Sequence, residues 1–362
     1  MMTKAVKPGM VISAGVWRDN LLVLQQNTVL TTNIIRRLAD WGINTVRVKA
    51  ESCNNWGNDC RIENIKDALA EDEIHFIQQY TKAVKLTNEL FERMREDENL
   101  PYEALRNLAT LDLYQLAQGK SVLAKLYKIK PFTDYTSRHA VDTGIIAGVL
   151  GRWLNLPIEQ TKILVLCGLM HDIGKSQISR AILEKPGNLT CEERKTINLH
   201  PEYGYYMAKN IPGIISAVLY AILQHHEREN GEGYPNKLVS RNIHPVAKIV
   251  AVADVYDAMT TERIYQKSVT PFTALETLIE DMFIRLDKEC CKVLIRNICR
   301  TLIGSVVMLS DGSQAEVVQF SHFMSAKPVV SKKTGVVIDL YFRNDLSIVE
   351  VIMFNNALSK DL

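Results

Sequence analysis

Hydrophobic positions along the chain change their spacing twice, and the changes predict three kinds of structure. Between residues 10 and 50, the runs MVIS, NLLVL and INTVRV have strand composition, and Ile35 and Leu38 fall on one face of a helix between them. From 69 to about 300 the spacing is helical. After 304, the pairs SVVML/QAEVVQF and PVVS/GVVIDL predict two hairpins. We expect a mainly α protein with an all-helical core, a small N-terminal α/β module and a small C-terminal β module.

These changes also predict where the chain divides. Residues 51–65 are rich in asparagine and have the composition of a linker. The expected segments are an N-terminal module at 1–65, a helical connector at 66–124, a core domain at 125–300 and a β module at 301–362.

An apolar stripe opens the helical region. Its members are three and four residues apart, as on one face of a helix: Ile77, Tyr80, Val84, Thr87, Phe91 and Met94. The stripe could pair with a second copy of the chain as a coiled coil or pack on its own domain. Because it covers fewer than four heptads, we favour packing within the domain.

Composition narrows the class of protein without assigning a function. Hydrophobic residues make up 47% and charged residues 23% of the chain, and 43 basic against 41 acidic residues give a net charge of +2. This balance gives no general field for a nucleic-acid polymer or a membrane surface. No run approaches the roughly 18 apolar residues of a spanning helix, no signal-peptide pattern opens the chain, and the seven cysteines form no CxxC pair. We expect a cytoplasmic protein.

The strongest chemical signal is the run LVLCGLMHDIGK, in which an apolar helix ends at His171 and Asp172. A neutral imidazole beside a carboxylate can hold a first-row metal ion, and the two oxygens of Asp172 could bridge two ions. On a continuing helix Lys175 would face the same side as this pair and could contact a phosphate. A single His-Asp pair would be weak support, because such dipeptides also occur at ordinary helix ends.

Five further candidate ligands lie in helical contexts. They are His139 in YTSRHAVD, His200 in NLHPEYG, His225 and His226 in ILQHHE, and Asp254 in KIVAVADVYD. Each alone is more often a structural residue, but an unpaired carboxylate such as Asp254 would be costly in an apolar helix. With His171 and Asp172 they supply five imidazoles and two carboxylates, enough for a site with two metal ions.

The order of these motifs resembles the HD-GYP phosphodiesterase family over about residues 125–300. The blocks that carry the resemblance are His139, HDIGK at 171–175, His200-Pro201, HHE at 225–227, GYP at 233–235 and DVYDAMTTERIY at 254–265. The resemblance implies an all-helical core, a cluster of iron or manganese ions, and hydrolysis of cyclic di-GMP to pGpG or GMP.

The resemblance also assigns roles to individual residues. The implied metal ligands are His139, His171, Asp172, His200, His225, His226 and Asp254. Asp172 would bridge the ions, and Asp172 and Lys175 would be the catalytic side chains. Lys175 and Arg263 would contact phosphate, and Gly233, Tyr234 and Pro235 would shape the substrate pocket.

Three departures from the family pattern adjust these expectations. Tyr135 stands where members with three ions carry a glutamate, so two divalent ions are expected. Asn230 and Glu232 alter the block before GYP, and Gln266 replaces a basic residue. These changes bear on affinity and rate more than on reaction type.

Two rival functions stay open. One is a non-catalytic receptor for cyclic di-GMP, and the other is a phosphohydrolase acting on another cyclic dinucleotide such as 3′,3′-cyclic GMP-AMP. The expected partner is cyclic di-GMP, with no nucleic-acid polymer and no membrane. A homodimer or a signalling-protein partner is left open.

Overall fold

The computed structural model describes most of the chain after residue 69. The described ranges are 70–97, 100–129, 135–185, 187–261, 269–322 and 325–354, with two short strands and single residues between 10 and 48. The described residues up to Gln78 form one compact unit, and those from Gln79 to Phe354 form another. The finer segment boundaries expected from the sequence stay a prediction.

In the first unit the described residues agree in part with the prediction. Strand β1 (Val16–Arg18) pairs antiparallel with β2 (Leu21–Leu24), and Ile12 forms a β-bridge with Val48. Strand β2 falls in the run NLLVL, whereas β1 lies outside the predicted runs. Ile35 and Leu38 are helical and buried. The predicted linker at 51–65 lies outside the described residues.

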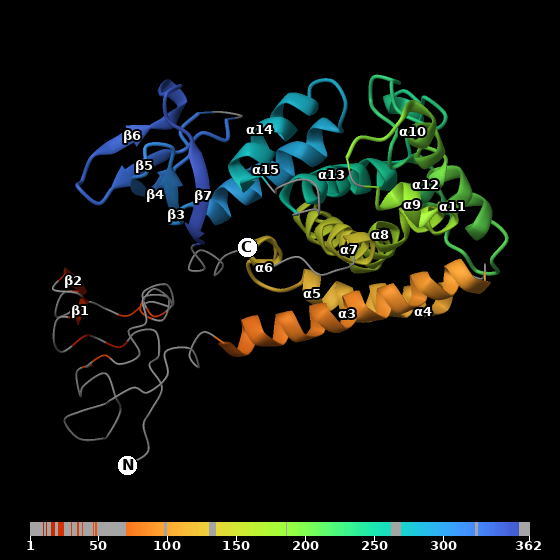
Figure 1. Cartoon of the computed structure of the whole chain (residues 1–362), viewed down its shortest axis with the longest axis horizontal. Coiled ribbons are helices and arrows are strands. Elements are labelled where there is room, and N and C mark those ends of the chain that lie inside the picture. Colours follow the sequence, from red (N-terminus) through yellow and green to blue (C-terminus); the bar gives the residue numbers. More distant parts are fainter. Residues whose placement is uncertain are drawn as a thin grey trace, which may run out of the picture. The chain divides into compact units, whose positions relative to one another are not determined.

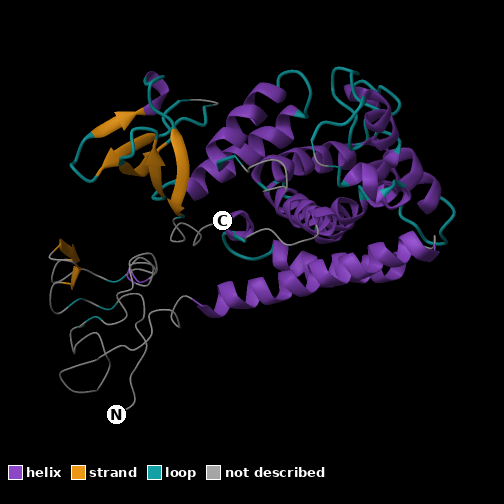
Figure 2. Cartoon of the chain, in the orientation of Figure 1, coloured by secondary structure: helices purple, strands orange, loops and turns teal. Residues whose placement is uncertain are grey.

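The second unit is mainly helical, as Figure 2 shows in purple. Its helices are α3 (Ala70–Asp97, which begins in the first unit), α4 (Tyr102–Asn107), η2 (Leu108–Leu113), α5 (Tyr114–Ala117), α6 (Val122–Lys128), α7 (Tyr135–Trp153), α8 (Ile158–Met170), η3 (Ile173–Gln177), α9 (Arg180–Leu183), α10 (Cys191–Ile197), α11 (His200–Ala208), α12 (Ser216–Gln224), η4 (Ser240–Asn242), α13 (Pro245–Thr260), α14 (Pro271–Asp281) and α15 (Lys288–Leu302). Helices α7, α8 and α13 pack against one another at its centre. Within the described ranges, no helix has the length and apolar character needed to cross a membrane.

The central helices of the core are buried on nearly all sides. Residues Ser137–Gly151 of α7 and Leu164–Met170 of α8 are buried without a break. A Cβ at Gly168 would lie 2.7 Å from the Cα of Gly144, so the two helices touch through glycines. This close contact brings the C-terminal end of α8, where His171 and Asp172 lie, beside α7.

Helix α3 packs on the core through the predicted stripe (Figure 1). Tyr80, Val84, Thr87, Phe91 and Met94 are all at most 6% exposed. The Tyr80 hydroxyl donates a 2.6 Å hydrogen bond to the buried carboxylate of Asp142 on α7. The first member of the stripe was predicted wrongly, because Ile77 is 42% exposed. Packing within the domain is confirmed for the other five.

The C-terminal part is a five-stranded antiparallel sheet with the order β6-β5-β4-β3-β7. Its strands are β3 (Val306–Leu309), β4 (Gln314–Gln319), β5 (Val329–Lys332), β6 (Val337–Asp339) and β7 (Ile348–Met353), with the short helix η5 (Leu340–Phe342) between the last two. Strands β3 and β4 form one predicted hairpin, and β5 and β6 form the other. Strand β7 was not predicted; it closes the sheet by pairing with β3.

Candidate metal centre

Seven side chains that the sequence singled out meet inside the helical core, mostly at helix ends. His171 caps the C-terminus of α8 and Asp172 follows it, His200 begins α11, and His225 caps α12. Pro201 suits the first turn of α11, where its missing N–H is not needed. His139 and Asp254 come instead from within α7 and α13.

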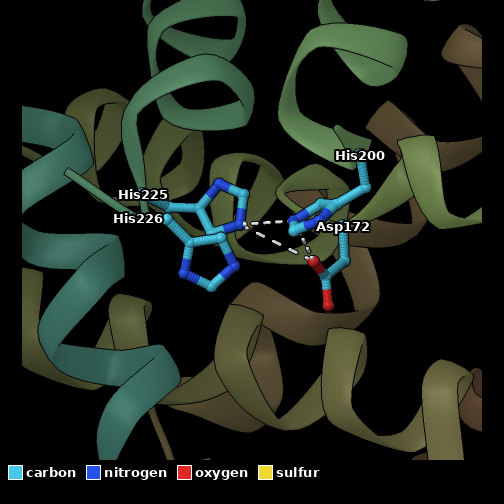
Figure 3. Close-up of side chains that lie close together, drawn as sticks. All are labelled: Asp172, His200, His225 and His226. Atoms are coloured by element: carbon cyan, nitrogen blue, oxygen red, sulfur yellow. Dashed lines mark hydrogen bonds and ion pairs between the residues drawn. The ribbon is translucent and has the colours of Figure 1, made fainter. Parts of the chain in front are cut away.

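The ligand atoms fall into two groups. Asp172, His200, His225 and His226 form the first, and His139, His171 and Asp254 form the second; within each group the atoms lie within 4.8 Å of one another. We call them the His200 group and the His139 group. Figure 3 shows the four side chains of the His200 group turned toward one another.

The carboxylate of Asp172 lies between the two groups. Its Oδ1 is 3.0 Å from His200 Nε2 and 3.6 Å from His225 Nε2. Its Oδ2 is 3.3 Å from His171 Nε2 and 3.6 Å from His139 Nε2. Each oxygen therefore faces a different group, an arrangement that suits a bridging ligand.

Four imidazoles turn the same nitrogen toward this centre, because an acceptor holds the other one. The Nδ1 atoms of His171, His200 and His225 lie 2.6, 2.7 and 2.9 Å from the carbonyl oxygens of Gly168, Ile197 and Ile222. A carbonyl can only accept, so each Nδ1 carries the proton and each neutral ring presents an Nε2 lone pair. Such support behind a ligand is common at metal sites.

Two of these lone pairs face one another in the pocket at a short distance. His200 Nε2 and His225 Nε2 are only 3.1 Å apart, a distance at which two lone pairs repel unless a proton or cation lies between them. His171 Nε2 is buried and makes no hydrogen bond. An atom in that position is costly without a partner. The buried His and Asp residues therefore fit divalent metal ions.

The fourth imidazole, His139, is held by a carboxylate that the sequence analysis did not assign. Asp257 Oδ2 lies 2.6 Å from His139 Nδ1, and Asp257 also accepts a bond from the Thr261 hydroxyl. Although burial works to lower the pKa of His139, the hydrogen bonds that its ring donates to Asp254 and Asp257 raise this pKa to about 9. The spacing of Asp257, one turn after Asp254 in DVYD, was the available signal.

The pKa shifts of four other residues of the centre favour charged carboxylates and neutral imidazoles. Burial would raise the pKa of Asp172, but the neighbouring His171 and Lys175 hold it well below its usual range. The pKa of Asp254 is also held low against burial, chiefly by the hydrogen bond from His139. Burial lowers the pKa of His225 to about 4 and also lowers that of His226. Metals bind these forms of both residue types.

Lys175 reaches the centre by a different path from the one predicted. The α-helix ends at Met170 and the chain continues as the 3₁₀ helix η3, so the phase of an α-helix does not apply to Lys175. Its Nζ nevertheless lies 2.5 Å from Asp172 Oδ2. A Cβ at Gly174 would lie 1.9 Å from the His200 carbonyl oxygen. Only glycine allows η3 to pack this closely on α11.

The GYP segment forms one wall of the centre. Tyr234 stacks on His226 with ring centroids 4.6 Å apart. Behind it, the buried Glu227 accepts bonds from the backbone N–H groups of Asn236 and Leu238, at 2.7 and 2.8 Å. A Cβ at Gly233 would lie 2.5 Å from the His226 carbonyl oxygen, so this loop also requires a glycine. Glu227 is a second supporting residue that the sequence analysis left without a role.

Three of the positions that depart from the family pattern, Asn230, Glu232 and Tyr135, are described in the structure. The exposed Glu232 accepts a 2.7 Å bond from the Asn230 side chain. Tyr135 stacks on His139, with centroids 5.4 Å apart, where a third ion's ligand would otherwise be expected. Arg263 and Gln266 lie outside the described residues.

Comparison with known proteins decides the family. A family model described as "HD domain" matches residues 121–289. Residues 121–289 belong to the HD domain family. The match contains all seven candidate ligands and ends before the C-terminal sheet, and it confirms the resemblance seen in the sequence.

Relatives of this chain carry the name phosphodiesterase. The chain is 32% identical over 199 residues to "Cyclic di-GMP phosphodiesterase PA4108" of Pseudomonas aeruginosa, covering 55% of this chain and 48% of that protein. It is 33% identical over 166 residues to "3'3'-cGAMP-specific phosphodiesterase 1" of Vibrio cholerae, covering 46% and 38%. The chain thus spans about half or less of the length of these relatives.

A solved structure supports the fold. The chain resembles Bd1817, a HDG"Y"P protein from Bdellovibrio bacteriovorus, with a TM-score of 0.53 over 82% of this chain and 96% of that one. The sequence identity is 17%, so the likeness concerns the fold alone.

Proposed function

We propose that this chain is a metal-dependent phosphodiesterase that hydrolyses cyclic di-GMP to pGpG or GMP. The observation that carries the proposal is the Asp172 carboxylate, whose oxygens lie 3.0 Å from His200 Nε2 on one side and 3.3 Å from His171 Nε2 on the other. The names of the relatives give the substrate class.

The proposed ligands would hold two divalent ions, iron or manganese, one in each group. When bound, such ions lower the pKa of a water molecule and neutralise charge on a phosphate. His200, His225 and His226 would hold one ion and His139, His171 and Asp254 the other, and Asp172 would serve as a ligand to both. Imidazole and carboxylate ligands suit both metals, so the ligand set does not select between them.

Other side chains would bind and orient the substrate. The Lys175 side chain pairs with Asp172 and is 21% exposed, so it supplies a positive charge at the edge of the centre. Its ammonium could stabilise charge on a phosphate oxygen in the transition state. Tyr234, stacked on His226 in the GYP segment, would bound the pocket with Gly233 and Pro235, and Arg263 would add a second contact to phosphate.

The test is turnover of cyclic di-GMP by Mn- or Fe-loaded protein under anaerobic conditions, with products separated by chromatography. Linear pGpG or GMP is expected from the wild type and none from Asp172→Ala. Asp112→Ala is the matched control, because Asp112 is exposed and remote in sequence from the ligands. Equal activity in Asp172→Ala would refute the proposed site.

A second substrate follows from the relative in Vibrio cholerae that is specific for 3'3'-cGAMP by name. The same assay with 3′,3′-cyclic GMP-AMP compares kcat/KM for the two dinucleotides. A higher value for cyclic GMP-AMP would reassign the substrate and leave the reaction class unchanged. Tight binding of either dinucleotide without any product would favour a receptor instead.

A further inference from the structure

One arginine of helix α3 is bonded to the backbone that carries Lys175. The guanidinium of Arg95 donates to the carbonyl oxygens of Ile178, Ser176 and Lys175, at 3.1, 3.3 and 3.4 Å. The side chain is 19% exposed, so these bonds are largely shielded from water. Arg95 lies outside residues 121–289, the part that matches the HD domain model.

The segment that Arg95 holds is confined from two sides. On one side, Gly174 touches the backbone of His200 so closely that no Cβ would fit. On the other, Arg95 collects three carbonyls, and Glu92 of the same helix pairs with Arg180 just beyond the segment. The position of η3 relative to Asp172 is therefore set by α11 and α3 together.

The chemistry of this contact requires an arginine. The last carbonyls of a short helix lack the full set of partners found within a longer one; here the Ile178 N–H bonds to the Lys175 carbonyl, and the planar guanidinium supplies further donors in fixed directions. A lysine would offer one ammonium and could not reach three carbonyls in the same geometry. The contact thus fixes a backbone path and does more than add a positive charge.

We infer that Arg95 is a positioning residue that holds Lys175 against Asp172. Lys175 Nζ lies 2.5 Å from Asp172 Oδ2, and the backbone of Lys175 is one of the three groups bonded to Arg95. The inference rests on the proposed phosphodiesterase function, in which Lys175 stabilises charge on the phosphate. It adds to the site a residue from a helix that precedes the HD domain match.

The test compares Arg95→Met with Arg93→Met. Methionine keeps the apolar stem of Arg95, and Arg93 is an exposed arginine on the same helix. We expect Arg95→Met to lower kcat about tenfold to a hundredfold, as small displacements of a catalytic group do, with a smaller change in KM. Bound metal, measured by mass spectrometry of the elements, should stay at the wild-type ratio, and Arg93→Met should match the wild type throughout.

A double-mutant cycle with Lys175→Met separates positioning from general stability. If Arg95 acts through Lys175, Arg95→Met should cause no further loss of kcat in the Lys175→Met protein. Full multiplication of the two losses would overturn the inference, as would a kcat for Arg95→Met equal to that of Arg93→Met.

Hydrogen exchange gives a readout that does not depend on turnover. The amides of residues 173–180 should exchange faster in Arg95→Met than in Arg93→Met, while those of α7 and α8 stay protected. Unchanged exchange at 173–180 would overturn the inference even if the proposed substrate is wrong. Faster exchange in a protein without any phosphodiesterase activity would keep the contact and refute the proposed function.

Discussion

The two candidate ligand groups differ at one imidazole, His139, which is held by a carboxylate, whereas a backbone carbonyl holds the Nδ1 of His171, His200 and His225. In the His200 group, backbone carbonyls hold the Nδ1 atoms of His200 and His225. In the His139 group, the carboxylate of Asp257 holds the Nδ1 of His139 at 2.6 Å. The pKa of His225 is lowered to about 4, whereas that of His139 is raised to about 9. One group is thus ready for a cation, and the other holds a proton that a cation must replace.

The comparison teaches that the same residue type can be prepared in two ways. A carbonyl orients an imidazole without adding charge, and burial then keeps the ring neutral. A carboxylate orients it and makes it more basic, so it binds a proton more tightly and also becomes a stronger ligand. Asp172 is a member of the His200 group but also faces the His139 group, so its removal should affect both.

Removing Asp172 should have the largest effect. Asp172→Ala deletes both oxygens that lie between the groups, and we expect loss of at least one bound ion and of detectable turnover, a reduction of about a thousandfold or more given the role of paired metals. Elemental mass spectrometry and the product assay measure this, with Asp112→Ala as control. Retention of two ions per chain in Asp172→Ala would show that this carboxylate is not shared.

Removing the charge behind His139 should weaken one group only. Asp257→Asn keeps the size of the side chain but not its charge, and we expect about a 10- to 100-fold loss of metal affinity at the His139 group. Titration calorimetry should show one weakened and one unchanged binding event. Equal weakening of both events would contradict the division into two groups.

Gly174→Ala should disturb the contact between η3 and the His200 group. The added Cβ would meet the His200 carbonyl oxygen at 1.9 Å, so the backbone must move. We expect a loss of about 1–3 kcal/mol in the free energy of unfolding, as for overpacked sites. Urea denaturation measures it, with the wild-type chain as the control. An unchanged free energy relative to that control would show that η3 can shift freely.

The two groups should differ in their pH dependence. Near pH 7.5 His139 is protonated and His225 is neutral, so binding at the His139 group releases a proton and its affinity should rise about tenfold per pH unit until pH 9. In the metal-free protein, the same raised pKa stabilises the fold below about pH 6.5, and this contribution is lost as the pH rises through 9. Calorimetry in two buffers with different protonation enthalpies counts the protons. Release of equal numbers of protons on metal binding at both groups would contradict the predicted difference in their protonation.

The sequence named the candidate ligands but not the residues that hold them in place. His-Asp, His-Pro and His-His motifs mark helix ends, and their order along the chain resembles a family, so all seven candidates could be named without coordinates. Asp257 and Glu227 were missed because their roles depend on partners 118 and 9–11 residues away, which no local pattern shows. The bonds of Arg95 to residues 175–178 reach backbone carbonyls 80–83 residues away, so the side chains of that segment carry no signal of the contact.

The fold was predicted in kind and less well in detail. Helical spacing predicted the core, and turn residues predicted two hairpins. Strand β7 was missed; its residues alternate in burial only imperfectly. The path of Lys175 was predicted wrongly because an α-helix was continued through Gly174, where tertiary contact with α11 favours a 3₁₀ turn instead.

The most direct test of a shared carboxylate is a crystal of the wild type grown with Mn²⁺, with diffraction recorded at the manganese absorption edge. We predict two anomalous peaks, one beside His200 and His225 and one beside His139, His171 and Asp254, each in contact with a different oxygen of Asp172. A single peak, or two peaks of which only one contacts Asp172, would contradict the account.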